Sequence, residues 1–169
     1  MEPVSEPVPE GEVAEVVRNV LETLLAAMGL EVSVVTGEGA PVASSEETAA
    51  PVAFDIKGDD LGILIGRRGQ TLSCLQYLVR LIVGRRTGSW VPIVIDVEGY
   101  KQRRYRALQA LALRIAEQVQ AGQMPFTLEP MSAYERRIVH LTLAEHPDVT
   151  TQSIGEGEAR KVVILPREN

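Results

Sequence analysis

Cysteine and aromatic residues are scarce in this sequence, and both scarcities restrict what the protein can be. Its 169 residues include one cysteine, Cys74, two Phe, one Trp and four Tyr. A single cysteine cannot form an intramolecular disulfide, which fits a reducing cytoplasm. Because 45% of the residues are hydrophobic but few are aromatic, the core must be mainly aliphatic.

Long apolar runs are also missing. No stretch approaches the roughly 18 to 20 apolar residues that span a bilayer. The first residues, Met-Glu-Pro-Val-Ser-Glu-Pro, are acidic and punctuated by proline, unlike a signal peptide. We therefore expect a cytoplasmic protein without a transmembrane segment, with room for one medium domain or two small ones.

Positive charge is rare in the first part of the chain and concentrated later. The net charge is −6, yet residues 1–60 hold thirteen acids and two bases, whereas residues 67–106 hold nine bases and two acids. A ligand senses mainly the local field, because charges are screened over about 8 Å at physiological salt. The acidic average therefore does not exclude a polyanionic partner.

Hydrophobic periodicity predicts an N-terminal region with mixed elements. We expect a helix over 12–28, strands near 32–34 and 52–56, a one-turn helix at 61–65 capped by Asp59 or Asp60, a helix from Gln70 to about Gly84, and a strand over 90–97. The inner face of the longer helix is expected to include Leu72, Leu75, Leu78, Val79 and Ile82. Residues 1–10 should form a flexible acidic tail, and residues 37–50 a flexible loop.

A second region follows from residue 98. It should contain a helix over 99–121, a short strand near 126–128, a helix from the capping box formed by Ser132 and Glu135 to about residue 145, and a hairpin that pairs 149–153 with 161–165. The pattern predicts an α+β protein with two domains, at 11–97 and 98–169.

The loop Gly66-Arg67-Arg68-Gly69 lies between two predicted helices. Glycines lack a Cβ, so they allow unusual dihedral angles and close approach of a phosphate to the main chain. The following helix would direct its free amides to the same point, and the arginines supply forked donors. An ordinary surface turn is the competing interpretation. A P-loop is excluded because Gly-Lys-Ser/Thr is missing, and the glycine spacing does not fit a dinucleotide site.

Arg136 and His140 lie four residues apart on the capped helix, so both project from one face, and Arg137 flanks them. Taken alone, this pattern is typical of a solvated helix face. The helix predicted over 99–121 carries basic residues near its start, among them Arg103 and Arg104. Cations at a helix N-terminus are unfavourable because the helix dipole makes that end positive. These residues could line a nucleic-acid path or serve another purpose, and Lys161 could extend the Arg136 and His140 face.

The sequence resembles the Jag family, whose members carry a KH domain and then a domain named for an arginine and a histidine separated by three residues, here called R-three-H. The resemblance rests on Ile65-Gly66-Arg67-Arg68-Gly69-Gln70-Thr71-Leu72 and on Met131-Ser132-Ala133-Tyr134-Glu135-Arg136-Arg137-Ile138-Val139-His140. It implies a type II KH fold, with the order helix-strand-strand-helix-GxxG-helix-strand, and phosphate or single-strand contact by Arg136 and His140. The additional N-terminal domain common in the family is not recognised in this chain. Ser73-Cys74 replaces the usual Asp-Ala, and we expect Cys74 to be a small helix-packing residue.

These patterns favour a binder of single-stranded RNA over an enzyme, and they leave single-stranded DNA open as a further ligand. No cofactor or metal site is evident. The candidate RNA-binding residues are Ile65, Gly66, Arg67, Arg68, Gly69, Gln70, Arg103, Arg104, Arg136, Arg137, His140 and Lys161. The resemblance implies a post-transcriptional regulator or RNA chaperone linked to cell-envelope and cell-shape control. The alternative is a protein-interaction adaptor that pairs with a small KH-only protein or with membrane-insertion machinery.

Overall fold

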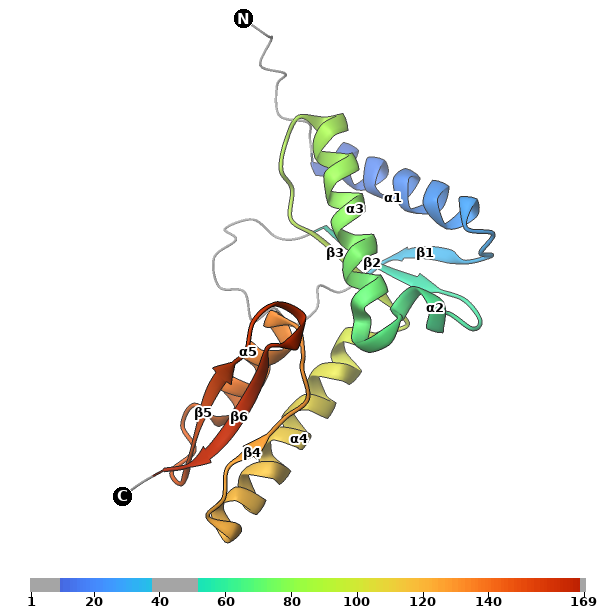
Figure 1. The fold of residues 1–169 in the computed structure, drawn as a ribbon. Coiled ribbons are helices and arrows are strands. Elements are labelled where there is room, and N and C mark those ends of the chain that lie inside the picture. The colour runs from blue at the N-terminus through green and yellow to red at the C-terminus, as the bar shows by residue number, and fades with distance from the viewer. Residues whose placement is uncertain (1–9, 38–51, 168–169) are drawn as a thin grey trace, which may run out of the picture. The chain divides into compact units, whose positions relative to one another are not determined.

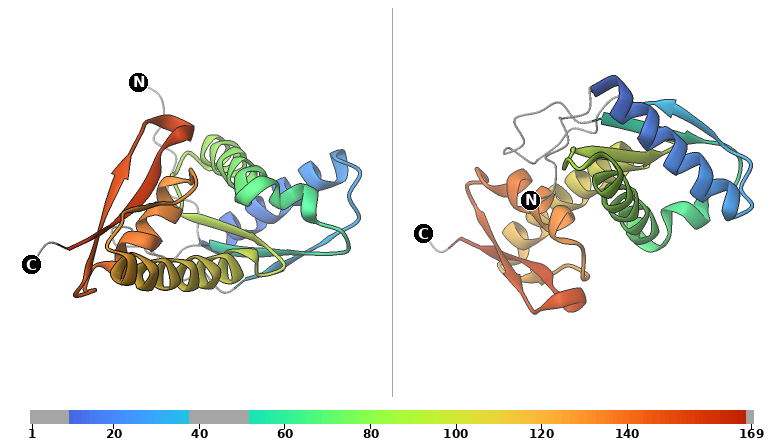
Figure 2. Two further views of the ribbon diagram at one scale, coloured as in Figure 1. Left: turned by 60° about the horizontal axis from the view of Figure 1, so that its bottom comes forward. Right: turned by 90° about the horizontal axis from the view of Figure 1, so that it is seen from above.

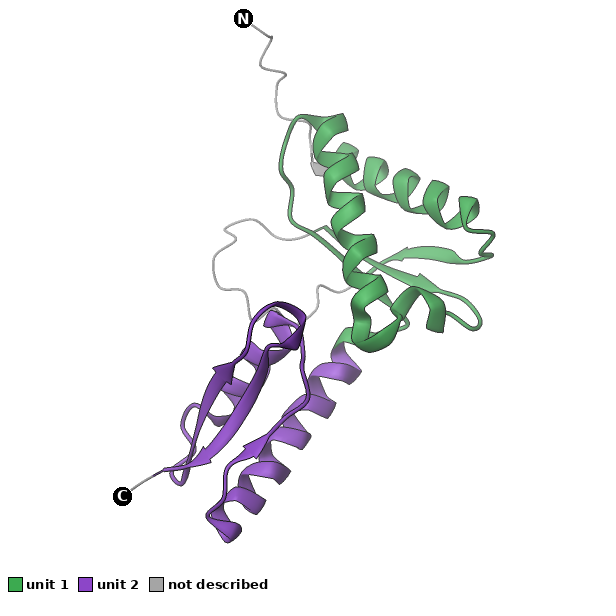
Figure 3. Ribbon diagram, viewed as in Figure 1, with its two compact units in different colours: residues 1–101 green, residues 102–169 purple. Residues whose placement is uncertain are grey.

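The chain folds into two compact units, residues 1–101 and residues 102–169 (Figure 3). The computed structural model describes residues 10–37 and 52–167. Apart from Glu10 and Gly37, the expected tail at 1–10 and the expected loop at 37–50 lie outside these described residues.

The first unit has the element order of a type II KH fold (Figure 1). Its elements are α1 (Glu10–Ala27), β1 (Ser33–Thr36), β2 (Val52–Lys57), α2 (Gly62–Ile65), the 3₁₀ turn η1 (Arg67–Gly69), α3 (Gln70–Thr87) and β3 (Ile93–Val97). Strand β2 lies in the middle of the sheet, antiparallel to β1 and parallel to β3. The predicted α+β class and element order are confirmed.

Helices α1 and α3 cover one face of this sheet (Figures 1 and 2). Alternation along the strands directs Phe54, Ile56 and Ile95 toward the helices. The core is aliphatic apart from Phe54 and the partly buried Tyr100. The buried residues of α3 are Leu72, Leu75, Val79, Val83 and Thr87.

The sequence-based description of α3 is wrong in three details. Leu78, expected on the inner face, is 47% exposed, because Leu75, Val79 and Val83 form a narrower buried stripe. The helix also continues past Gly84 and stops at Gly88, which adopts the left-handed conformation of a helix C-terminus. Cys74 is exposed and is not a packing residue.

The start of α2 also differs from the prediction. Leu61 is its N-cap residue, and neither Asp59 nor Asp60 caps the helix through its side chain. Asp60 itself adopts a positive φ of 51°. The buried Leu61 and Leu64 fix this turn on the core instead.

Side chains of α3 cover the outer edge of β3. Arg80 Nε donates a hydrogen bond to the carbonyl oxygen of Ile93 at 3.0 Å, and Gln76 Oε1 accepts one from the Ile95 amide at 3.0 Å. β3 is an edge strand of its sheet. Arg80 therefore makes a structural contact within the first unit.

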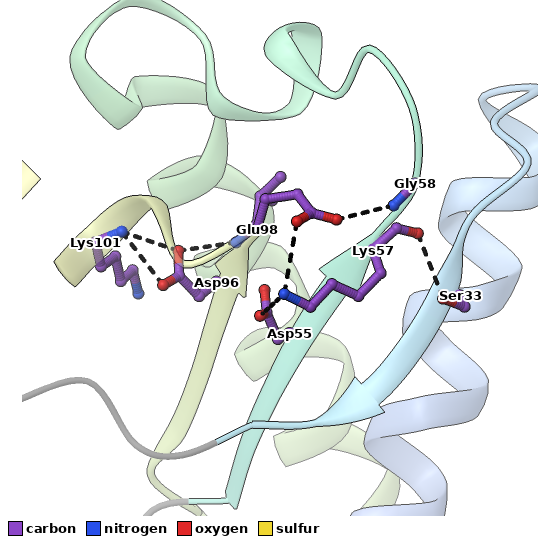
Figure 4. A network of polar contacts seen from close by, with 8 residues as sticks. Ser33, Asp55, Lys57, Gly58, Asp96, Glu98 and Lys101 are labelled. Atoms are coloured by element: carbon purple, nitrogen blue, oxygen red, sulfur yellow. Dashed lines mark hydrogen bonds and ion pairs between the residues drawn. The ribbon is translucent and has the colours of Figure 1, made fainter. Parts of the chain in front are cut away.

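A polar network ties the ends of β2 and β3 to the first turn of the next helix, α4 (Tyr100–Gly122) (Figure 4). Lys57 Nζ lies 2.7 Å from Asp55 Oδ2 and 3.6 Å from Glu98 Oε2. Asp96 Oδ1 accepts hydrogen bonds from the Val97 amide at 2.8 Å and from the Lys101 amide at 3.1 Å. The start of α4 is thus anchored to the first sheet.

The second unit packs two helices on an antiparallel sheet. Its elements after α4 are β4 (Phe126–Thr127), α5 (Ala133–Leu143), β5 (Val149–Ile154), the 3₁₀ turn η2 (Gly157–Ala159) and β6 (Lys161–Pro166), with strand order β4-β6-β5. The core lies between Ala112 and Ile115 of α4, Val139 of α5, and Val162 and Ile164 of β6. The predicted capping box is present, since Ser132 and Glu135 each accept a hydrogen bond from the other's backbone amide.

Among the described residues, no helix is long and apolar enough to cross a membrane.

Candidate nucleic-acid interface

The 66–69 loop has a backbone that depends on its glycines. Gly66 adopts φ 68° and ψ −171°, and Gly69 adopts φ 77° and ψ 13°. The Gly66 conformation is essentially restricted to glycine. Arg68, between them, is also left-handed at φ 55° and ψ 33°. Three left-handed residues out of four turn the chain sharply from α2 into α3.

Both glycines are also required by close packing. A methyl group on Gly66 would lie 2.0 Å from Thr71 Oγ1 and 2.7 Å from Thr71 Cβ. On Gly69 it would lie 2.9 Å from Cε1 of Tyr100. The loop therefore has neighbours on its inner side that leave no room for a Cβ.

The N-terminus of α3 faces out of this loop. Gly69 is its N-cap residue and has no side chain to cap the first turn, and that turn carries no acidic residue. The first amides of a helix have no acceptor within the helix, and the helix dipole makes this end positive. The 18-residue α3 can therefore offer main-chain donors to an anion at the loop.

The side chains of the predicted loop site fall into two groups. Arg67 and Gln70 are exposed, whereas Arg68 and Ile65 are half-buried. Ile65 packs against the core of the unit. Leu61 is buried, while the nearby Ile63 is 66% exposed. The most accessible cation of the loop is therefore Arg67.

Arg136 and His140 lie together on α5, and both are engaged within the second unit. Arg136 Nη1 donates a hydrogen bond to the carbonyl oxygen of Met131 at 2.8 Å. The ring of His140 lies between two hydroxyls of β5, with Nδ1 2.6 Å from Thr151 Oγ1 and Nε2 2.8 Å from Ser153 Oγ. These contacts fix the orientation of the imidazole.

Burial lowers the pKa of His140 below its ordinary value of 6.5, and the nearby positive charge of Arg136 lowers it further. The ring is therefore mostly neutral at pH 7. One ring nitrogen then donates to a hydroxyl and the other accepts. Since a neutral ring adds no charge, the positive field of this face comes from Arg136 and the exposed Arg137.

Arg104 forms an ion pair within the second unit, which leaves its charge less available to bind a polyanion. Its Nε lies 2.7 Å from Glu135 Oε1, and the Glu135 side chain is almost fully buried. Glu135 Oε2 also accepts a hydrogen bond from the Ser132 amide at 3.2 Å. Arg104 thus holds the start of α5 against α4, whereas its neighbour Arg103 is exposed.

Lys161 does not extend the face of Arg136 and His140. It opposes Ile154 in the β5–β6 ladder, whereas Ser153, which contacts His140, opposes Val162. Successive residues of a strand point to opposite sides. Lys161 therefore emerges from the sheet face opposite to the one that α5 covers.

Four residues that shape these sites were not predicted as site residues from the sequence: Thr71, Tyr100, Thr151 and Ser153. Thr151 and Ser153 alternate on the same side of β5 as the core residue Val149. Hydroxyls at inward positions of a strand need a hydrogen-bonding partner. The alternation of Thr151 and Ser153 could therefore have indicated that they contact a polar side chain such as His140. Tyr100 left no such sign, because its contact with Gly69 bridges thirty-one positions of sequence.

Comparison with known families accounts for both units. Residues 14–95 match the KH domain of KhpA and KhpB, and residues 106–166 match the R-three-H domain. Among curated relatives, the chain is 46% identical over 124 residues to the RNA-binding protein KhpB of Clostridium symbiosum. It is 38% identical over 121 residues to the protein of the same name from Bacillus subtilis.

These alignments cover 73% and 70% of this chain, but 56% and 58% of the two relatives. The chain thus spans little more than half the length of these proteins. The matched parts include the 66–69 loop and the Arg136 and His140 pair. With a KhpA/KhpB-type KH domain, an R-three-H domain after it and relatives of this identity, the chain belongs to the KhpB (Jag) family.

Proposed function

We propose that this chain binds single-stranded RNA and holds its sugar-phosphate backbone at the 66–69 loop. The curated relatives are named RNA-binding proteins, which supports this class of ligand. KH domains clamp about four backbone nucleotides at a GXXG loop. The proposal includes no chemical reaction: RNA is a ligand, and the protein acts in the cytoplasm as a post-transcriptional regulator or RNA chaperone linked to cell-envelope and cell-shape control.

The observation that carries the proposal is the position of the loop on α3. Two glycines bring the main chain close to an incoming phosphate, the uncapped helix start supplies amide donors, and the exposed Arg67 supplies charge. All three features serve a phosphate oxygen, and none distinguishes one base from another. We therefore expect strong dependence on salt and weak dependence on base sequence.

The second contact of the proposal is the α5 face of the R-three-H domain. Arg137 and Arg136 would supply its charge, while the neutral His140, held by Thr151 and Ser153, would present a fixed ring edge. Arg103 remains a candidate for further backbone contact. Arg104 and Lys161 are weaker candidates, because one is paired with Glu135 and the other lies on the opposite sheet face.

A charge-reversal experiment tests the loop. In Arg67→Asp/Arg68→Asp, we expect RNA affinity to be lost while the circular dichroism spectrum is unchanged. The matched control is Arg85→Asp/Arg86→Asp, which changes the charge equally at the opposite end of α3. Retained affinity in the loop variant, or equal loss in both variants, would refute the loop as the binding site.

Salt dependence provides a second measurement on the unmodified protein. If about four phosphates are neutralised, the slope of log affinity against log salt should be about −3 for a single strand. A slope near zero would exclude a phosphate grip. The same titration with single-stranded DNA of identical base sequence shows whether the sugar is recognised.

A protein-interaction role is the second candidate, and one surface favours it. The side of α3 turned away from the core exposes Tyr77, Leu78 and Leu81, at 61%, 47% and 42%. The helix carries arginines and no acidic residue. A contiguous apolar strip of this kind suits a protein partner, such as a small KH-only protein, better than it suits solvent.

This candidate has its own test. Sedimentation of the purified chain with a small KH-domain protein, before and after Leu78→Lys/Leu81→Lys, should show a complex that the substitutions abolish. If RNA binding persists in that variant, the two functions use different surfaces. Failure to form any complex, or a complex unaffected by the substitutions, would refute this surface.

A further inference from the structure

We propose that Tyr100, the first residue of α4, is a positioning residue that holds the 66–69 loop in the conformation that binds phosphate. The proposal rests on the function proposed above and adds a residue outside the loop to it. Tyr100 does not belong to the GXXG motif. Its role would be to act on RNA through Gly69.

Direct packing of the ring on Gly69 is the first support. A Cβ on Gly69 would lie 2.9 Å from Tyr100 Cε1, 3.6 Å from Cζ and 3.5 Å from the hydroxyl oxygen. The ring therefore covers the side of Gly69 where other residues carry a side chain. Gly69 is buried although it belongs to a loop between two helices. From α3, the Ser73 hydroxyl donates to the Gly69 carbonyl oxygen at 2.9 Å.

The conformation of the loop shows why support is needed. Gly66, Arg68 and Gly69 all have positive φ, and a left-handed arginine is unfavourable in isolation. Such conformations persist only where the surroundings hold them in place. Because the Ser73 hydroxyl binds the Gly69 carbonyl and the Tyr100 ring packs on Gly69, the main chain of Gly69 is fixed at the point where α3 begins.

Tyr100 can support the loop only if its own position is fixed, and several contacts hold it in place. Its ring packs against the core of the first unit. Glu98 and Gly99 both have positive φ, so the chain turns sharply between β3 and α4. The Asp96 carboxylate accepts hydrogen bonds from the Lys101 amide (Figure 4). Lys101 Nζ donates to Gln76 on α3 at 2.6 Å. The ring therefore stands on a rigid first turn.

The main test measures RNA affinity in the full chain with a labelled single-stranded oligonucleotide. Tyr100→Leu keeps an apolar side chain but removes the flat ring, and Tyr100→Phe keeps the ring but removes the hydroxyl. If the loop is binding-competent only about a tenth of the time without the ring, affinity falls about tenfold in Tyr100→Leu. Tyr100→Phe should bind as the wild type does. The matched control is Tyr105→Leu, a tyrosine further along α4.

A purely structural role is separated by a double variant. If Tyr100 acts through the loop, Tyr100→Leu should cause a smaller loss of affinity in an Arg67→Ala background, where affinity is weakened but measurable, than it causes in the wild type. Unchanged affinity in Tyr100→Leu would overturn the proposal, as would an equal loss in Tyr100→Phe or full additivity with Arg67→Ala. If Arg67→Asp/Arg68→Asp retains affinity, the proposed function itself fails, which is a different result.

A measurement on the wild-type protein keeps the proposal testable if Tyr100→Leu does not fold. The ring should shift the Hα resonances of Gly69 away from their values in an unstructured reference peptide and give nuclear Overhauser contacts to them. Both signals should persist when the oligonucleotide is bound. Their absence, or their disappearance on binding, would overturn the proposal.

Discussion

Replacement of Gly66 by alanine should disable the loop, and the structure gives the magnitude. An L-residue at φ 68° and ψ −171° costs about 1–3 kcal/mol. The added methyl would lie 2.0 Å from Thr71 Oγ1, and overpacking of this kind costs about another 1–3 kcal/mol. Together they predict a loss of about 2–6 kcal/mol in the free energy of unfolding of the first unit, or a rearranged loop that no longer binds RNA.

Urea denaturation and RNA titration of the same samples would measure both outcomes. Gly62→Ala is the matched control, because a methyl there meets nothing within 4 Å. Thr71→Gly removes the side chain with which the new methyl would clash. The double variant Gly66→Ala/Thr71→Gly should therefore regain the part of the unfolding free energy lost to that clash, which corresponds to a coupling energy of about 1–3 kcal/mol between the two positions. The reasoning would be refuted if Gly66→Ala had the stability and RNA affinity of the wild type, or if the double variant showed no coupling between Gly66 and Thr71.

Two further predictions concern the R-three-H domain. Arg104→Ala leaves the Glu135 carboxylate, 4% exposed, without its cation, so chemical denaturation should show a loss of about 3 kcal/mol, largely restored by adding Glu135→Gln. An Arg104→Ala variant as stable as wild type would show that this pair does not hold α5. Because the native pKa of His140 lies below its ordinary 6.5, its contribution to stability is complete above that pH and decreases as the pH falls through the native pKa. Calorimetry between pH 7.5 and 5.5 should therefore show a smaller fall in unfolding temperature for His140→Gln than for wild type, and equal falls would contradict the assignment.

Elements with strong local signals could be predicted from the sequence. Alternation in β2 and β3, the Ser132 and Glu135 capping box and the glycine-bounded loop each depend on residues a few positions apart. These signals determined the α+β class and the order of elements. They also placed Arg67 and Arg137 on exposed positions of the two candidate faces.

Features that depend on distant contacts could not be predicted in this way. Leu78 fits a helical apolar face as well as Val83 does, and only the positions of α1 and the sheet decide which is buried. The buried partner of Arg104 lies thirty-one residues away. The β5–β6 register, which separates Lys161 from the α5 face, follows from the whole hairpin and not from the lysine itself.

The contacts of Arg80 and Gln76 along β3 affect how this protein behaves when crowded. An open strand edge can pair with a strand of another molecule and start aggregation. Here the Ile93 carbonyl and the Ile95 amide are already bonded to side chains of α3, so an incoming strand would have to displace them. If many copies assemble along one RNA, their KH sheets lie at high local concentration. Helix α3, which carries the proposed RNA-binding loop, thus also shields the β3 edge of its own sheet from strand exchange with neighbouring copies.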